Sequence, residues 1–147
     1  MKVAIDVHGV ITKIPSFFSL LTKYFIENGH EIHILTGSKI TDELIERLKK
    51  CEIQYTHLFS IVDYHTSIGT EIFWEDENNP WIDAEIWNKT KAEYCERNNI
   101  DLWIEDDETY RPYAKTPFVL FKTDLPNFDG YVSKHRVDPR KLNEVEE

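Results

Sequence analysis

The chain has 147 residues, of which 41% are hydrophobic and 30% are charged, and its formal net charge is −10. This length and composition predict one globular domain that buries its own core. No apolar run reaches the roughly 20 residues that cross a bilayer, so we expect no membrane partner. The short apolar stretch at the N-terminus is broken by Asp6 and His8, which indicates a first strand rather than a signal peptide.

The charge and the cysteine content limit the partners and the compartment further. The 17 Lys and Arg residues form no basic block, so we expect no nucleic-acid polymer as a partner. A small phosphorylated substrate is compatible with the acidic balance, because a bound cation can reverse the local field. Cys51 and Cys95 are too few for a disulfide framework, which predicts a reducing, cytoplasmic location.

Strand and helix patterns alternate along most of the chain. In order, the hydrophobic spacing predicts a strand over 3–5, a helix over 15–28, a strand over 31–35, a helix over about 41–50 with Leu44, Ile45 and Leu48 inward, a strand within 55–64, a hairpin with arms at 71–74 and 81–84, a helix ending near 98, and strands over 100–104 and 118–121.

The predicted fold is therefore α/β: a three-layer, Rossmann-like parallel sheet with helices on both faces and a small hairpin insertion. We divide the chain into a core over residues 1–125, which holds a cap-like insertion at about 60–86, and a C-terminal surface tail over 126–147.

Polar residues follow three of the predicted strands at the point where each strand ends. Asp6 follows the first strand, Thr36 the second, and the acidic run 105–107 the strand over 100–104. In parallel α/β sheets, sites form outside the carboxyl ends of the strands. The three segments are therefore expected to meet at one edge of the sheet.

Residues of these types could handle a phosphoryl group. A carboxylate before a glycine-containing turn, such as Asp6, can attack phosphorus and form an aspartyl-phosphate. Neighbouring carboxylates repel one another unless a cation bridges them, and Mg²⁺ prefers oxygen ligands of this kind. Thr36 offers a hydroxyl, and Gly37 and Ser38 offer backbone N–H groups at the expected opening of a helix, where anions bind.

In this order, the segments resemble motifs of the haloacid dehalogenase superfamily. Its first motif, an apolar strand with Asp, any residue, usually Asp, then Gly and Thr or Val, is similar to residues 5–12 (IDVHGVIT). Its second motif, an apolar strand ending in Thr or Ser, is similar to residues 32–37 (IHILTG), and its fourth, an apolar strand ending in two acids, to residues 102–107 (LWIEDD). The resemblance covers about residues 2–121.

The resemblance implies a role for each of these positions. Asp6 would be the nucleophile and a Mg²⁺ ligand, and the backbone carbonyl of His8 would also bind the metal. Thr36 would hold a phosphoryl oxygen. The acidic pair completes the metal shell, and both possible registers within 105–107 make Asp106 the direct ligand.

The superfamily's third motif is a lysine near a helix start, and two lysines compete for this role. At helical spacing, Lys91 shares an apolar face with Trp87 and Cys95, whereas Lys89 lies on a charged face. We favour Lys91 as the residue that clamps the phosphoryl group, with Lys89 as the alternative.

His8 departs from the superfamily pattern, because its phosphatases usually have a second Asp there as general acid and base. A histidine titrates near neutral pH and could do the same work. The expected function is a Mg²⁺-dependent phosphatase that cleaves a phosphomonoester, with a nucleotide as one candidate, through an aspartyl-phosphate on Asp6. The alternatives are non-phosphatase chemistry of this superfamily and a catalytically weak protein that binds phosphate or a partner.

The insertion contains Phe73, Trp74 and Trp81. We expect these aromatic residues in the core or at a contact of a homo-oligomer, and stacking on a planar substrate group is the alternative. His57 and His65 lack a metal-ligand spacing with the cysteines, so no zinc site is expected from them.

Overall fold

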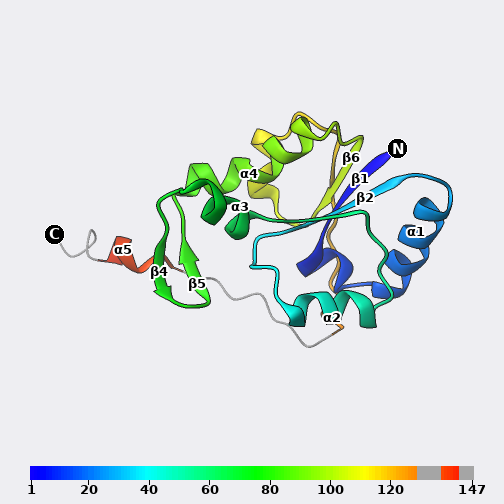
Figure 1. Cartoon of the computed structure of the whole chain (residues 1–147), viewed down its shortest axis with the longest axis horizontal. Coiled ribbons are helices and arrows are strands. Elements are labelled where there is room, and N and C mark those ends of the chain that lie inside the picture. Colours follow the sequence, from blue (N-terminus) through cyan, green and yellow to red (C-terminus); the bar gives the residue numbers. More distant parts are fainter. Residues whose placement is uncertain (129–136, 143–147) are drawn as a thin grey trace.

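The computed structural model describes residues 1–128 and 137–142. Its centre is a sheet of five parallel strands in the order β3-β2-β1-β6-β7, with β1 in the middle (Figure 1). The strands are β1 (Lys2–Asp6), β2 (Glu31–Thr36), β3 (His57–Ser60), β6 (Leu102–Glu105) and β7 (Phe118–Leu120). The predicted α/β fold with a parallel sheet is confirmed.

Helices cover both faces of this sheet. Figure 1 shows α1 (Pro15–Glu27) and α2 (Asp42–Lys50) on one side, and α3 (Ile61–Ile68) and α4 (Ala84–Arg97) on the other. The helix α1 begins at Pro15, whose fixed φ suits a first turn. It ends just before Gly29, which has a φ of +80° and so provides the left-handed residue that stops a helix.

Alternation along the strands divides the buried residues into two cores. Val3 and Ile5 of β1 pack with Phe18 of α1 on one face, whereas Ala4 packs with Cys95 of α4 on the other. Successive side chains of a strand point to opposite faces. This period of two decides which helix each strand residue meets, and it becomes important at the ends of β1 and β6.

The strand predicted within 55–64 is present as β3, but the helix after it was not predicted, and one residue of α2 is more exposed than expected. The third strand is short, and the chain turns into α3 at Ile61, because the Ser60 hydroxyl accepts the Asp63 N–H at 3.0 Å and caps a helix. An apolar run of this length is compatible with either strand or helix. In α2, Leu44 and Leu48 are buried as expected, but Ile45 is 39% exposed.

The insertion also contains the predicted hairpin, made of β4 (Phe73–Asp76) and β5 (Asn79–Trp81). Three short helical segments complete the described chain: an irregular turn over Val7–Ile11, a 3₁₀ helix over Glu108–Tyr113 and α5 (Pro139–Leu142). Of the predicted tail over 126–147, residues 129–136 and 143–147 lie outside the described residues. Among the helices that the structure describes, none combines the length and the apolar character needed to cross a membrane.

Candidate functional site

A buried ion network lies at the carboxyl edge of the sheet. Lys91 Nζ donates to Asp6 Oδ1 at 2.9 Å and to Glu105 Oε2 at 2.8 Å. All three side chains are buried, and Lys91 is only 2% exposed. Of the two lysines that the sequence offers, Lys91 and not Lys89 is therefore the one that lies beside Asp6.

Strand alternation explains why these three side chains meet. Asp6 has the parity of Ala4, and Glu105 has the parity of Trp103, so both carboxylates point to the face that α4 covers. Lys91 lies on the inner side of α4 among buried neighbours. Two strand ends and one helix thus direct one ammonium between two carboxylates.

A third carboxylate, that of Asp106, completes an acidic cluster. Carboxylate oxygens of Asp6, Glu105 and Asp106 all lie within 4.8 Å of one another. Glu105 is engaged by Lys91, and its other oxygen accepts the Asp106 N–H at 3.2 Å. Among these oxygens, those of Asp6 and Asp106 are the best suited to a hard cation, and oxygen ligands of this type are what Mg²⁺ takes.

The electrostatics of the cluster follow from three carboxylates around one ammonium. Burial and the neighbouring Glu105 carboxylate raise the pKa of Asp6 well above its ordinary value, against the opposing effect of Lys91. Burial would also raise the pKa of Glu105, but the charge of Lys91, together with hydrogen bonds from Lys91, Asp6 and Asp106, lowers the Glu105 pKa. Burial raises the pKa of Asp106. Because negative charge is in excess, a proton or a cation stabilises the cluster.

A tight turn brings Gly9 against Asp106. Gly9 has a φ of +86°, after His8 in an extended conformation (φ −75°, ψ 126°). A Cβ added to Gly9 would lie 1.9 Å from Asp106 Oδ2. Only glycine fits here, for its backbone conformation and for the close approach. The same turn carries the His8 carbonyl, which was predicted to bind the metal.

The His8 side chain is held by Arg47 of α2. Arg47 Nη1 lies 3.1 Å from His8 Nε2, and a guanidinium can only donate. His8 therefore accepts at Nε2, and its ring carries no proton on this atom. Arg47 was not among the predicted site residues, although α2 follows the second motif directly.

The loop after β2 differs from the expected helix opening. Helix α2 begins only at Asp42, and Thr41 caps it, so Gly37 and Ser38 are not at its N-terminus. Thr36 is 1% exposed, and its hydroxyl accepts the Ser38 N–H at 3.2 Å. Gly37 and Ser38 line the cleft at the site, whereas Thr36 is not among the lining residues. The expected helix-dipole contribution to anion binding is therefore wrong for these residues.

A cleft of about 960 Å³ opens above the acidic cluster. Although the chain is strongly acidic, five of its 17 Lys and Arg residues line this cleft. They are Lys13, Lys39, Arg47, Lys91 and Lys122. The lining also contains six acidic residues, which are Asp6, Glu43, Glu105, Asp106, Asp107 and Asp124. The cleft therefore presents both signs of charge, and an anionic ligand would need a bound cation beside the carboxylates.

Two segments far apart in sequence form the outer walls of the cleft. The tip of the β4–β5 hairpin contributes Asn78 and Pro80, and Lys39 Nζ donates to the Glu77 carbonyl at 2.9 Å, which ties the hairpin to the loop after β2. Phe73, Trp74 and Trp81 are not among the lining residues.

A further wall is formed by residues 122 and 124–127 of the segment that returns after β7. Lys13 Nζ donates to the Leu125 carbonyl at 2.6 Å, and the Phe128 N–H donates to the Thr12 carbonyl at 2.7 Å. The Thr12 hydroxyl also donates to the side chain of Asn127. The beginning of the predicted surface tail is therefore part of the cleft wall.

Comparison with known proteins adds no assignment: neither a protein-family model nor a curated protein matches this chain. The α/β fold with its parallel sheet is what the molecule itself establishes, and the chemistry of the cleft has to be inferred from the residues that line it.

Proposed function

We propose that this protein is a Mg²⁺-dependent hydrolase of the haloacid dehalogenase type that cleaves a phosphomonoester through an aspartyl-phosphate on Asp6. The observation that supports this most is the network in which buried Lys91 bridges Asp6 and Glu105, with Asp106 beside them, at the carboxyl edge of a parallel sheet. Sites of α/β proteins form at this edge.

In this proposal Asp6, Asp106 and the backbone carbonyl of His8 hold Mg²⁺. When bound, the ion supplies positive charge that neutralises the transferring phosphoryl group. Glu105 has a different role: because it is 1% exposed and accepts from Lys91, it holds the ammonium in place. Lys91 in turn orients the Asp6 carboxylate through Oδ1 and adds a second positive charge beside the reacting group.

The reaction has two displacements. An Asp6 carboxylate oxygen attacks phosphorus, a P–O(aspartyl) bond forms, and the P–O(ester) bond breaks; the alcohol leaves with the bonding electrons and takes up a proton. Water then attacks the phosphorus of the acyl phosphate, inorganic phosphate leaves, and the Asp6 carboxylate is restored with release of a proton. A neutral His8 could accept the proton of this water only at Nε2, and only after this atom exchanges its hydrogen bond with Arg47 for one with the water.

The charge and the volume of the cleft indicate the chemical class of the substrate, but not its identity. The five Lys and Arg residues of its mixed lining, together with a bound Mg²⁺, would offset the lining carboxylates beside a phosphate ester, and about 960 Å³ gives room for a leaving group of the size of a nucleoside. The side chain of Trp87 closes against Gly37, where an added Cβ would lie 2.8 Å from the indole ring. Gly37 thus allows a close approach of the loop to this wall. A nucleotide is the substrate candidate that we would test first.

The test is phosphate release from nucleotides and sugar phosphates, with and without Mg²⁺. We expect Mg²⁺-dependent release that falls by at least about 10³-fold in Asp6→Asn. The matched control is Asp107→Asn: this neighbouring carboxylate caps the 3₁₀ helix by accepting the Thr109 N–H at 2.9 Å, so its loss should change turnover only a few-fold. Release that needs no Mg²⁺, or that survives Asp6→Asn, would refute the proposal.

One observation supports a second candidate, a protein that binds phosphate with little turnover. Arg47 donates to His8 Nε2, so this atom has no proton to give to a leaving group. Folded protein that binds Mg²⁺ and inorganic phosphate, yet releases phosphate from no tested ester, would favour this candidate over the hydrolase.

A further inference from the structure

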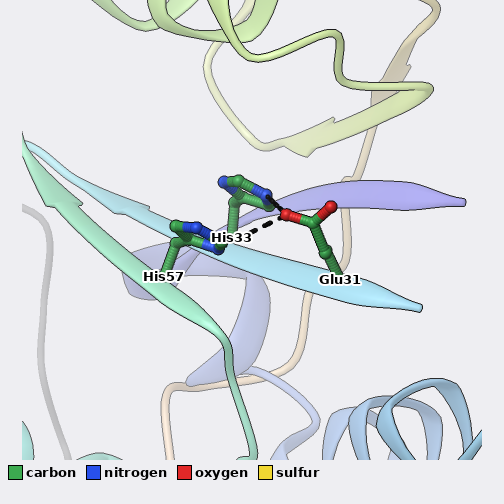
Figure 2. Close-up of side chains that lie close together, drawn as sticks. All are labelled: Glu31, His33 and His57. Carbon is green, nitrogen blue, oxygen red and sulfur yellow. Dashed lines mark hydrogen bonds and ion pairs between the residues drawn. The ribbon is translucent and has the colours of Figure 1, made fainter. Parts of the chain in front are cut away.

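A second cluster of ligand-type side chains lies nearer the amino ends of β2 and β3, apart from the acidic cluster. Glu31 and His33 of β2 and His57 of β3 face one another there, and Figure 2 shows both imidazole rings directed at one carboxylate oxygen. His33 Nε2 lies 3.1 Å and His57 Nδ1 lies 3.7 Å from Glu31 Oε1.

The strand register brings these three residues together. His33 and His57 are direct partners in the parallel pairing of β2 with β3, and Glu31 is two residues before His33, on the same face of β2. The two rings are stacked, with centroids 4.0 Å apart and an interplanar angle of 3°. Because β3 is at the edge of the sheet, His57 is half-exposed while His33 is buried.

We propose that Glu31, His33 and His57 bind a divalent transition metal of the zinc class. Two imidazole nitrogens and a carboxylate oxygen are a ligand set that zinc takes, with a fourth position left for water. In a tetrahedral shell with ligand bonds of roughly 2.0–2.1 Å, ligand atoms are roughly 3.3 Å apart. The two measured separations, 3.1 and 3.7 Å, lie on either side of this value.

The remaining contacts of the cluster match what surrounds metal ligands in proteins. His33 Nδ1, the nitrogen turned away from Glu31, is 2.7 Å from the Tyr94 hydroxyl, and an outer hydrogen bond of this kind fixes the orientation of a ligating histidine. Glu31 Oε2, the oxygen turned away from the histidines, is 3.5 Å from Lys2 Nζ. The carboxylate therefore presents Oε1 to both rings.

Binding requires one movement and one exchange of partners. A metal must lie near the plane of each ligating ring, so one ring of the stack has to tilt. His57 can do this, because its side chain is 48% exposed. Its Nδ1 would exchange the hydrogen bond to the Thr56 hydroxyl, at 2.9 Å, for the metal. At His33 the ion would take the place of the proton that lies between Nε2 and Glu31 Oε1.

The experiment is a Zn²⁺ titration by calorimetry of the full chain carrying Asp6→Asn, in excess Mg²⁺, so that the acidic cluster does not contribute. We expect one Zn²⁺ per chain, and a loss of affinity of at least about tenfold in His57→Ala and in Glu31→Gln. His57→Ala is the main variant because this exposed side chain contributes little to the core. The control is His30→Ala, which removes the neighbouring histidine that packs against Phe25, with ring centroids 5.4 Å apart.

A second readout identifies the ligands independently of affinity. Co²⁺ substituted for Zn²⁺ should give the visible absorption of a four-coordinate ion in the parent and in His30→Ala, but not in His57→Ala. Unfolding midpoints in urea without metal should be the same for the three proteins. Zn²⁺ binding that is equal in His57→Ala and the parent, or that is lost in His30→Ala, would overturn the proposal.

Discussion

Replacing Lys91 by methionine is the sharpest test of the buried network, because it removes the charge and keeps most of the volume. The substitution leaves Asp6 and Glu105 buried without the ammonium that lies 2.9 and 2.8 Å from them. Removing one partner of a buried ion pair costs about 3–5 kcal/mol of unfolding free energy. We expect a loss of this size in Lys91→Met.

The geometry shows why the loss should not be smaller or much larger. At an effective dielectric constant of about 20, one pair of unit charges 2.9 Å apart attracts by about 6 kcal/mol. Desolvation of the charges offsets much of this attraction in the native protein. In the variant, Asp6 can also relieve the repulsion by remaining protonated, since burial and Glu105 already raise its pKa. The two effects bring the net cost back to a few kcal/mol.

Urea unfolding, followed by tryptophan fluorescence and circular dichroism, measures this cost. With a slope of about 2 kcal/mol/M, a loss of about 3–5 kcal/mol lowers the midpoint by about 1.5–2.5 M. The matched control is Lys89→Met in the same helix. Lys89 is half-buried and lies outside the network. The unfolding free energy of Lys89→Met should therefore differ from that of the parent by about 0.5 kcal/mol or less.

If Lys91→Met does not fold, the combined variant Lys91→Met, Asp6→Asn, Glu105→Gln separates charge from packing. It leaves no unpaired carboxylate beside the methionine and should be more stable than Lys91→Met alone. Equal midpoints for Lys91→Met and Lys89→Met would refute the reasoning, and so would a combined variant that is no more stable than the single one.

Three further predictions concern the turn, the thiol and a buried histidine. Gly9→Ala should lower the unfolding free energy more than Gly29→Ala does, and it should weaken Mg²⁺ binding. Both glycines have a positive φ, but only at Gly9 would an added Cβ collide with Asp106. Equal urea midpoints for the two variants and an unchanged Mg²⁺ affinity would contradict this. Burial raises the pKa of Cys95 to about 12, so iodoacetamide at about pH 8 should label the native chain at no more than one thiol, which peptide mapping by mass spectrometry will check. Burial lowers the pKa of His65 in the folded state. As the pH falls below about 6.5, the unfolded chain therefore takes up a proton at His65 before the folded chain does, and the contribution of this residue to stability is lost. A His65→Gln protein whose stability falls as steeply as that of the parent between about pH 7 and 5 would contradict this.

The position of the acidic cluster could be predicted from sequence because it depends on local rules. Asp6 and the acidic run 105–107 follow apolar strands, and parallel strands bring their carboxyl ends to one edge. Helical spacing was sufficient to distinguish Lys91 from Lys89. The part played by Glu105 was missed, although strand alternation carries the signal: it is two residues after buried Trp103 and therefore points to the same helix.

Other features could not be predicted, because they depend on tertiary contacts. The segment 122–128 has no periodicity, and hydrogen bonds to Thr12 and Lys13 on the first turn bring it to the cleft. Arg47 reaches His8 only because α2 packs beside the turn after β1. The cluster of Glu31, His33 and His57 depends on the register of β2 with β3, which single-sequence patterns do not fix.

The two clusters lie on the same face of the sheet, with the histidines nearer the amino ends of the strands. His57 and its partner His33 are level with Ala4, two residues before Asp6, and β3 is two strands away from β1, so the backbones of His57 and Asp6 are roughly 12 Å apart. At this distance two unit charges in water interact by about 0.4 kcal/mol, and physiological salt screens them over about 8 Å. His57→Ala should therefore leave Mg²⁺-dependent phosphate release unchanged. An effect of Zn²⁺ on release that persists in His57→Ala must then arise at Asp6 and its neighbouring carboxylates, and not at the histidines.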